Sequence, residues 1–156
     1  MTEIYCSGEN EPYNYPPMPR EYFERFPPQG SMMNPQSVLH CIDHPSRVMT
    51  YGHRLLGGAR KSGIFEIVPP VMLVLSIHDK FRETDHEDEP HHGLLAANWA
   101  SGEGLLTGPH FHMMRFLLQQ HSIDDGESHA MDVPWIWKYA LSIVKDADSG
   151  TGNKIY

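Results

Sequence analysis

The stretch GPHFHMMRFLLQQHSIDDGESHAMD, residues 108–132, combines a helical pattern with many side chains that bind metal ions or phosphate. A short helix carrying His110, His112 and Arg115 is expected to end at the acidic turn DDGES, residues 124–128. Carboxylate oxygens suit a divalent metal ion, and a guanidinium suits the phosphate that such an ion would hold. The alternative is that the acids only cap a helix and that the histidines lie on its exposed face.

Helical spacing of apolar residues on both sides of this stretch predicts a mainly α-helical chain. A diproline followed by an apolar run marks one helix start, and apolar residues recur at helical spacing in the last third of the chain. Residues 47–56 fit a helix as well as an irregular strand, so periodicity leaves that segment open. Helices are expected over residues 20–26, 70–82, 93–97, 109–121 and 127–145.

The N-terminal part of the chain is rich in proline. Eight prolines alternate with tyrosine and phenylalanine in residues 1–46, which predicts an extended Pro/Tyr-rich arm. Aromatic side chains on such an arm are expected to cover an apolar surface of the same chain or of a second subunit, and we expect an arm that supports a homo-oligomer. The predicted organisation is an arm at 1–46, a helical domain at 47–146 and a flexible tail at 147–156.

Composition narrows the possible classes of function. A chain of 156 residues suits one domain with its own core, and a formal net charge of -8 argues against a general nucleic-acid binder. Cys6 and Cys41 are too few for a disulfide scaffold, and the first residues lack a secretion signal, so a cytoplasmic protein is expected. No apolar run approaches the ~20 residues of a membrane span, so no membrane partner is expected.

Three segments, in this order, resemble the phage MazG-like dATP/dGTP diphosphohydrolases. They are ARKSGIFEIVPP at residues 59–70, NWASG at 98–102, and HMMRFL followed by DGES between residues 112 and 128. The resemblance covers residues 57–145 and implies a MazG-like helical bundle. It implies hydrolysis of a purine deoxynucleoside triphosphate, dGTP or dATP, to the monophosphate and pyrophosphate. It also implies a homo-oligomer, a dimer or tetramer, because these sites usually lie between subunits.

The resemblance further implies a metal site at the acidic turn. Asp125, Glu127 and Asp132 would hold Mg²⁺ or Mn²⁺, with Asp124 and His129 as further candidate ligands. Glu127 and Asp125 would be the catalytic residues. Such ions neutralise phosphate oxygens and lower the pKa of the attacking water, which explains why carboxylates must converge there.

Five residues are candidates for binding the substrate under this resemblance. Lys61 and Arg115 would hold the polyphosphate, Phe65 or Trp99 would stack on the base, and Asn98 would read the edge of the base. Each has an ordinary structural explanation as well: a surface ion, a core aromatic or a helix-capping amide.

A second hydrolase hypothesis starts from the adjacent pair His78-Asp79 at the end of an apolar helix, a pair typical of metal-dependent HD phosphohydrolases. That class also needs an upstream histidine, for which His53 or His40 would serve, and a distant aspartate, for which Asp132 would serve. It predicts a different cut of the deoxynucleotide, which releases nucleoside and triphosphate.

A third hypothesis is a non-enzymatic viral binding or inhibitor protein. Its proline-tyrosine arm would bind a partner, and its acidic residues would only keep it in solution. The polar segment ETDHEDEPHH, residues 83–92, is expected to be a solvated loop, although its histidines and carboxylates keep a second metal site open.

Overall fold

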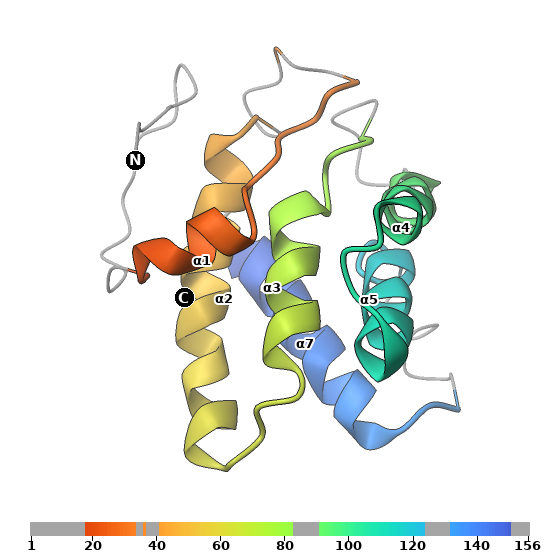
Figure 1. Cartoon of the computed structure of the whole chain (residues 1–156). Coiled ribbons are helices and arrows are strands. Elements are labelled where there is room, and N and C mark those ends of the chain that lie inside the picture. The colour runs from red at the N-terminus through yellow and green to blue at the C-terminus, as the bar shows by residue number, and fades with distance from the viewer. Residues whose placement is uncertain (1–17, 34–35, 37–40, 83–90, 124–131, 151–156) are drawn as a thin grey trace.

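The computed structural model of the protein describes residues 18–33, 36, 41–82, 91–123 and 132–150. Within these residues the chain forms six helices and no strand, which confirms the predicted mainly α-helical fold. The segment left open between helix and strand, residues 47–56, is helical. The helices are α1 (Arg20–Arg25), α2 (Asp43–Lys61), α3 (Val68–Ile77), α4 (His91–Glu103), α5 (Gly108–Gln120) and α7 (Trp135–Gly150) (Figure 1).

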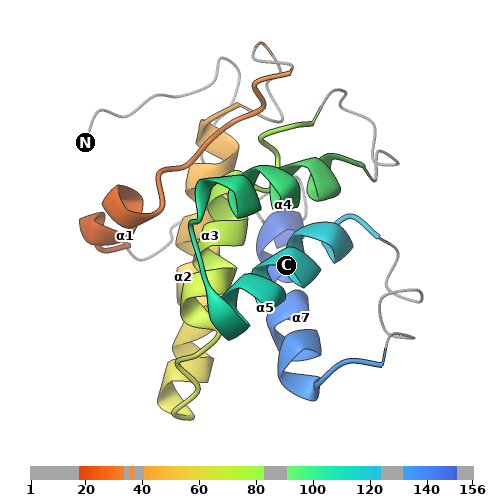
Figure 2. The ribbon, with the colours of Figure 1, turned by 45° about the vertical axis from the view of Figure 1, so that its right-hand side comes forward.

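Helix α3 is the centre of the bundle. Its sequence, VPPVMLVLSI, is apolar on every face, and its residues from Pro70 to Ile77 are buried. A helix without a polar face is stable only when other elements surround it. Helices α2, α5 and α7 all contact α3, and Figures 1 and 2 show it among them. The diproline lies in the first turn, where the missing N–H groups would have had no helical acceptor.

Helices α2 and α7 are amphipathic and cover α3 with their apolar faces. Gly52 allows the closest approach, because a methyl group added there would lie 2.1 Å from Cδ1 of Leu75. The absence of a side chain at Gly52 therefore lets Leu75 rest against the backbone of α2. The buried apolar residues of the two helices include Val48, Met49, Leu56 and Ala59 in α2, and Ala140, Leu141, Val144 and Ala147 in α7.

Part of the predicted N-terminal arm packs on the helical domain itself. Met18 and Phe26 are only 7% and 4% exposed and belong to the core cluster, with α1 between them in the sequence. Two expected boundaries fall inside helices: α2 already begins at Asp43, before residue 46, and α7 continues past residue 146 to Gly150. The start of α2 and the end of α7 therefore belong to the helical domain.

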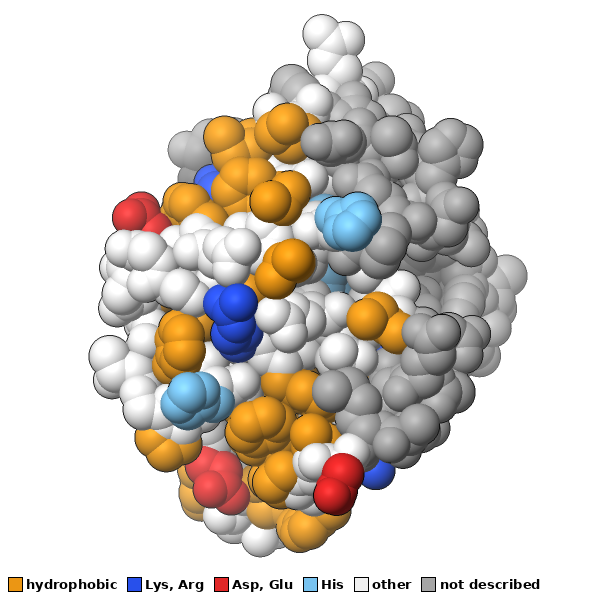
Figure 3. Space-filling view, turned by 90° about the vertical axis from the view of Figure 1, so that its right-hand side faces the viewer, with side chains coloured by type: hydrophobic (Ala, Val, Ile, Leu, Met, Phe, Trp, Pro, Cys, Tyr) orange, Lys and Arg blue, Asp and Glu red, His pale blue; other side chains and the backbone are white. Residues whose placement is uncertain are grey.

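The outer face of α4 and α5 is mixed in character. Figure 3, viewed from their side of the molecule, shows hydrophobic side chains in separate patches among polar ones. Exposed large apolar side chains in this part of the chain include Leu94, Leu95 and Leu105. Among the described residues, no helix combines the length and the apolar character that crossing a membrane requires.

Helix α4 packs on α5 at Gly93, where there is no room for a side chain. A methyl group added at Gly93 would lie 2.1 Å from the carbonyl oxygen of Leu118 and 3.2 Å from Cε1 of His121. The backbones of the two helices therefore approach closely at one point, and the neighbouring His92 is brought to His121.

This close approach predicts a large effect of one methyl group. Gly93→Ala is expected to destabilise the fold by ~1–3 kcal/mol, because the backbone of α5 must move to make room. Gly102→Ala is the matched control in the same helix: its added methyl meets nothing within 4 Å, and it should stabilise the protein by ~0.5–1 kcal/mol. Urea unfolding measures both changes, and equal stabilities of the two variants would contradict the packing.

Candidate metal centre

Six side chains with metal-binding groups meet where five helices end or begin. His44 is the second residue of α2 and His92 the second residue of α4, while His78 and His121 each follow the last residue of α3 and α5. The ends of α2, α3, α4 and α5 therefore contribute one imidazole each. The six residues are His44, His78, Asp79, His92, His121 and Asp148, the last of them near the end of α7.

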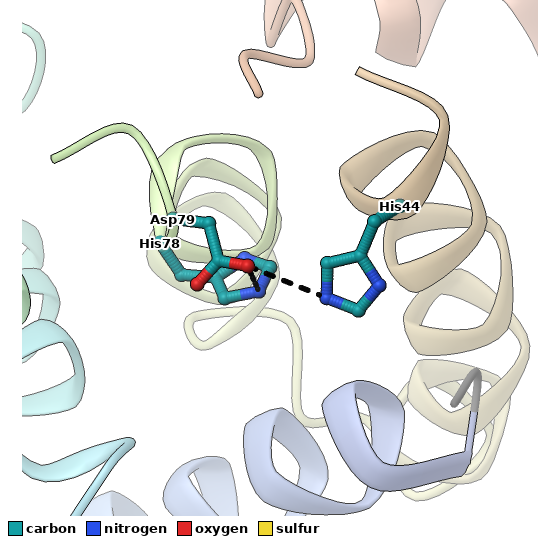
Figure 4. A group of neighbouring side chains, drawn as sticks. All are labelled: His44, His78 and Asp79. Atoms are coloured by element: carbon teal, nitrogen blue, oxygen red, sulfur yellow. Dashed lines mark ion pairs between the residues drawn. The ribbon is translucent and has the colours of Figure 1, made fainter. Parts of the chain in front are cut away.

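The first group of ligand atoms comes from α2, α7 and the end of α3. His44 and His78 each place Nε2 3.6 Å from Oδ2 of Asp79, and Figure 4 shows the three side chains directed toward one another. Oδ1 of Asp148 lies 3.0 Å from Nε2 of His44 and 3.4 Å from Nε2 of His78. The ligand atoms of His44, His78 and Asp79 all lie within 4.8 Å of one another, a separation that one metal ion can bridge.

The second group shares Asp79 with the first. Oδ1 of Asp79 lies 3.8 Å from Nε2 of His92, and Nε2 of His92 lies 2.9 Å from Nε2 of His121. The ligand atoms of this group also lie within 4.8 Å of one another. The two oxygens of Asp79 therefore face different pairs of histidines, as a carboxylate that bridges two ions must do.

Hydrogen bonds to helix carbonyls orient two of the imidazoles. Nδ1 of His78 donates to the carbonyl oxygen of Leu75 at 3.0 Å, and Nδ1 of His121 donates to that of Leu118 at 2.6 Å. Both acceptors lie three residues earlier, among the last carbonyls of a helix, which lack helical N–H partners. Because a carbonyl can only accept, Nδ1 carries a proton in each ring, and Nε2 is the nitrogen that faces the cluster.

The centre is buried on one side and reaches solvent on the other. His78 and His92 are 1% and 0% exposed, whereas the side chain of Asp148 is 35% exposed. Nε2 of His78 is buried and makes no hydrogen bond with any described residue. A buried nitrogen that faces carboxylates needs a proton or a cation beside them, and a bound cation would satisfy the group.

Charge in the cluster is arranged around the carboxylates. Burial lowers the pKa of His78, but the charges of Asp79 and Asp148 outweigh it and raise that pKa to about 9. Burial raises the pKa of Asp148, yet His78 and His44 hold it well below its usual value. The pKa of His121 falls to about 3, because it is buried and lies beside His92 and His78. Without an ion, a proton on His78 therefore offsets part of the negative charge of Asp79 and Asp148, which a bound metal ion would otherwise neutralise.

The leading metal site predicted from the sequence consists of other residues, at the acidic turn before α7. Asp124, Asp125, Glu127 and His129 lie outside the described residues. Asp132 is described and exposed, and it belongs to neither ligand group. Since Asp132 precedes α7, it lies ~20 Å along that helix from the cluster.

A different histidine, His44, lies where the HD hypothesis expected His53 or His40. His40 lies outside the described residues, and the ring of His53 packs edge-on against Tyr22 at 4.8 Å. His53 follows His44 by two and a half turns of α2, which puts the two rings on opposite sides of the helix. His44 is therefore the upstream histidine of the pair His78-Asp79.

The candidate substrate-binding residues fall into two places. Lys61 and Phe65 are exposed near the far end of α2, ~25 Å along the helix from His44. Asn98 and Trp99 follow His92 by about two turns of α4. Asn98 is exposed, whereas Trp99 is half-buried.

Two polar contacts involve Trp99 of α4 and the fifth candidate, Arg115 of α5. Nζ of Lys80 lies 4.5 Å from the ring centre of Trp99, and Arg115 donates to the hydroxyl of Ser101 at 3.4 Å. Trp99 and Arg115 therefore already have neighbours within the domain. The pair His78-Asp79 and His92 connect this centre with the sequence predictions, because His92 lies in the segment 83–92 where a second metal site stayed open. His92 is buried in α4 and is not part of a solvated loop, and His44, His121 and Asp148 were not expected as ligands.

Comparison with known proteins gives no family for the chain. No protein-family model, curated protein or solved structure matches it. The geometry and chemistry of the centre are therefore the features that indicate a function.

The two ligand groups predict the number of ions bound. The protein should bind two Mn²⁺ ions per chain by calorimetry, and His92→Gln should reduce this to one because it affects only the second group. Each bound Mn²⁺ ion, at 100 times the Kd of its site, should stabilise the fold by ~2.7 kcal/mol. The control His112→Gln changes an exposed histidine of α5 and should still bind two. Two ions retained by the His92 variant, or none bound by the unmodified protein, would contradict the assignment.

Proposed function

We propose that this protein is a metal-dependent phosphohydrolase whose centre is built on His78 and Asp79. The observation that carries the proposal is the position of Asp79, whose two oxygens each face a different group of imidazoles. A carboxylate shared by two ligand groups could hold two neighbouring ions, an arrangement that many phosphohydrolases use.

The donor set agrees with a transition metal. Imidazole-rich sites favour first-row ions such as Mn²⁺, Fe²⁺ or Zn²⁺, whereas Mg²⁺ prefers oxygen ligands and keeps much of its water. Of the two ions expected from the sequence, Mn²⁺ is the better match. When bound, such ions would neutralise phosphate oxygens and lower the pKa of an attacking water molecule.

The side chains of the chain itself have distinct tasks in this proposal. His78 and His121 direct Nε2 toward the cluster, because their Nδ1 atoms donate to helix carbonyls, and His78 would release the proton on Nε2 when an ion binds. His44 and Asp148 form the more accessible edge of the cluster, with side chains 12% and 35% exposed. A phosphate group would therefore approach from the edge formed by α2 and α7.

The order of the ligands along the chain supports the HD phosphohydrolase hypothesis. The pair His78-Asp79 has an upstream histidine in His44 and a distant aspartate in Asp148, which are the further residues that this class needs. A deoxynucleotide is the proposed substrate class, and nucleoside and triphosphate are the proposed products. The MazG-like hypothesis, with its ligands around Glu127, stays a prediction because its acidic turn lies outside the described residues.

Two substitutions distinguish these enzymes. Asp79→Asn should lower turnover of a deoxynucleoside triphosphate with Mn²⁺ at least ~100-fold, because losing the shared charge removes several kcal/mol of transition-state stabilisation. Glu127→Gln should leave turnover unchanged. Each deoxynucleoside triphosphate is incubated with protein and Mn²⁺, and the products are resolved by chromatography.

The products and a chelator complete the test. Removal of metal with EDTA should abolish turnover, and added Mn²⁺ should restore it. Monophosphate and pyrophosphate, lost in the Glu127 variant and kept in the Asp79 variant, would move the site to the acidic turn. Absence of turnover with every nucleotide and ion would sink the enzymatic proposal and favour a binding protein.

A further inference from the structure

The end of α3 is fixed by three different donors. The carbonyl of Leu75 accepts from the ring of His78, and the carbonyl of Ile77 accepts from the N–H of Lys80 at 3.0 Å. Between them, the carbonyl of Ser76 accepts from the N–H of Gln29 at 2.8 Å, a residue far away in the sequence. The last turn of α3 therefore depends on the N-terminal segment for one of its hydrogen bonds.

Residues 26–32, which we call the strap, continue along the chain that follows α3. The N–H of Met32 donates to the carbonyl of Lys80 at 2.9 Å, and the hydroxyl of Ser31 donates to the carbonyl of Arg82. Nζ of Lys80 donates in return to Oε1 of Gln29. The strap thus bonds to the chain on both sides of His78-Asp79, and its first residue, Phe26, is buried in the core.

We propose that the strap is a positioning element of the metal centre, with Ser31 as its main positioning residue. The inference rests on the proposed function, since it concerns the same His78 and Asp79. Ser31 acts through the backbone of the turn, because its hydroxyl bonds to a main-chain carbonyl that follows Asp79. The hydroxyl of Ser31 donates to the carbonyl of Arg82 and so fixes the end of the turn that is farther from α3.

The bond from the strap to the carbonyl of Ser76 determines where α3 stops. Ser76 is 0% exposed, so its carbonyl cannot be satisfied by bulk water. Without the N–H of Gln29, the carbonyl would gain a partner if the helix continued, because an α-helical carbonyl accepts from four residues later. His78 keeps helical backbone angles, and the N–H groups of Lys80 and Arg82 then donate to carbonyls only three residues earlier. The chain therefore leaves the α-helix through tight turns after His78, and the bonds of the strap to Lys80 and Arg82 fix those turns and with them the direction of Asp79. The strap supplies the bond that lets the helix end at Ile77.

The test compares Ser31→Ala with two matched variants. Ser31→Thr keeps the hydroxyl and should behave as the unmodified protein. Ile67→Val removes one buried methylene group at the opposite end of α3 and controls for a general loss of stability. Ser142→Ala removes a hydroxyl that bonds to a carbonyl within α7 and controls for the chemistry of the change.

Two measurements are made on each variant. Calorimetry with Mn²⁺ should show an affinity about tenfold lower for Ser31→Ala, the size expected when a partner of a ligand is lost, with no change in stoichiometry. Hydrogen exchange of the metal-free protein should be faster at the N–H groups of Lys80 and Arg82, and unchanged at Val71 near the start of α3.

The outcomes separate this inference from the proposed function. Unchanged affinity and unchanged exchange in Ser31→Ala would overturn the role of the strap, as would an equal loss of affinity in Ile67→Val. Mn²⁺ binding without turnover of any nucleotide would defeat the proposed function and leave the strap result valid. If the unmodified protein bound no Mn²⁺, the exchange measurement alone would decide whether Ser31 holds the turn.

Discussion

The point at which α3 ends governs the rest of the centre. An apolar helix in the middle of the bundle must stop while still buried, and its last carbonyls must find donors that are not helical. A histidine ring, the strap and the first amide after the turn provide them. Because the chain leaves the helix at that residue, His78 and Asp79 meet side chains from the ends of four other helices. The same bonds that terminate the helix therefore orient the candidate ligands.

Gathering these groups has an energetic cost that the rest of the bundle must offset. Removing a carboxylate from water costs several kcal/mol unless charges and hydrogen bonds compensate, and Asp79 is only 2% exposed. Its neighbours are imidazoles, which compensate only when they are protonated or share a cation. The apolar packing of α3 against α2, α5 and α7 supplies the stability that holds such a cluster together. A site that is poorly satisfied without a cation is also well prepared to bind one.

Much of the fold could be predicted from the sequence, because its signals are local. The diproline and apolar run of α3 and the periodic apolar face of α7 depend on neighbouring residues only. The expected boundaries at 46 and 146 were less informative, because proline and glycine content does not show which helix ends pack on the core. His44 and Asp148 lie just within helices at those two boundaries. They were overlooked as ligands for that reason.

The centre was harder to predict, because its residues come together only through the fold. His78-Asp79 could be recognised as an adjacent pair and His92 lies in a segment rich in histidine and acid, whereas His121 is an isolated histidine that looks the same as a capping or surface residue. The sequence holds one signal, because His78 directly follows an apolar run and His121 follows another after two glutamines. Their bonds to carbonyls three residues earlier are visible only in the fold. Two histidines in the same position relative to two apolar helices indicate a shared purpose. No sequence pattern indicates that Gly93 brings the two helices into contact there.

Charge gives the proposed mechanism a required order of events. The chain carries a net charge of -8, so a polyphosphate is repelled unless positive charge is placed at the site. Among the basic residues close to the ligands in the sequence, Arg47 and Arg82 are buried, and Arg47 pairs with Asp43 at 2.5 Å. Lys80 donates to Oε1 of Gln29, and Lys145 donates to the carbonyl oxygen of Ile123 at 2.6 Å. Metal ions would then be the main positive charge that a substrate meets at the edge formed by His44 and Asp148. In this mechanism metal binding precedes substrate binding, because the ion-free cluster presents its carboxylates to a substrate of the same sign.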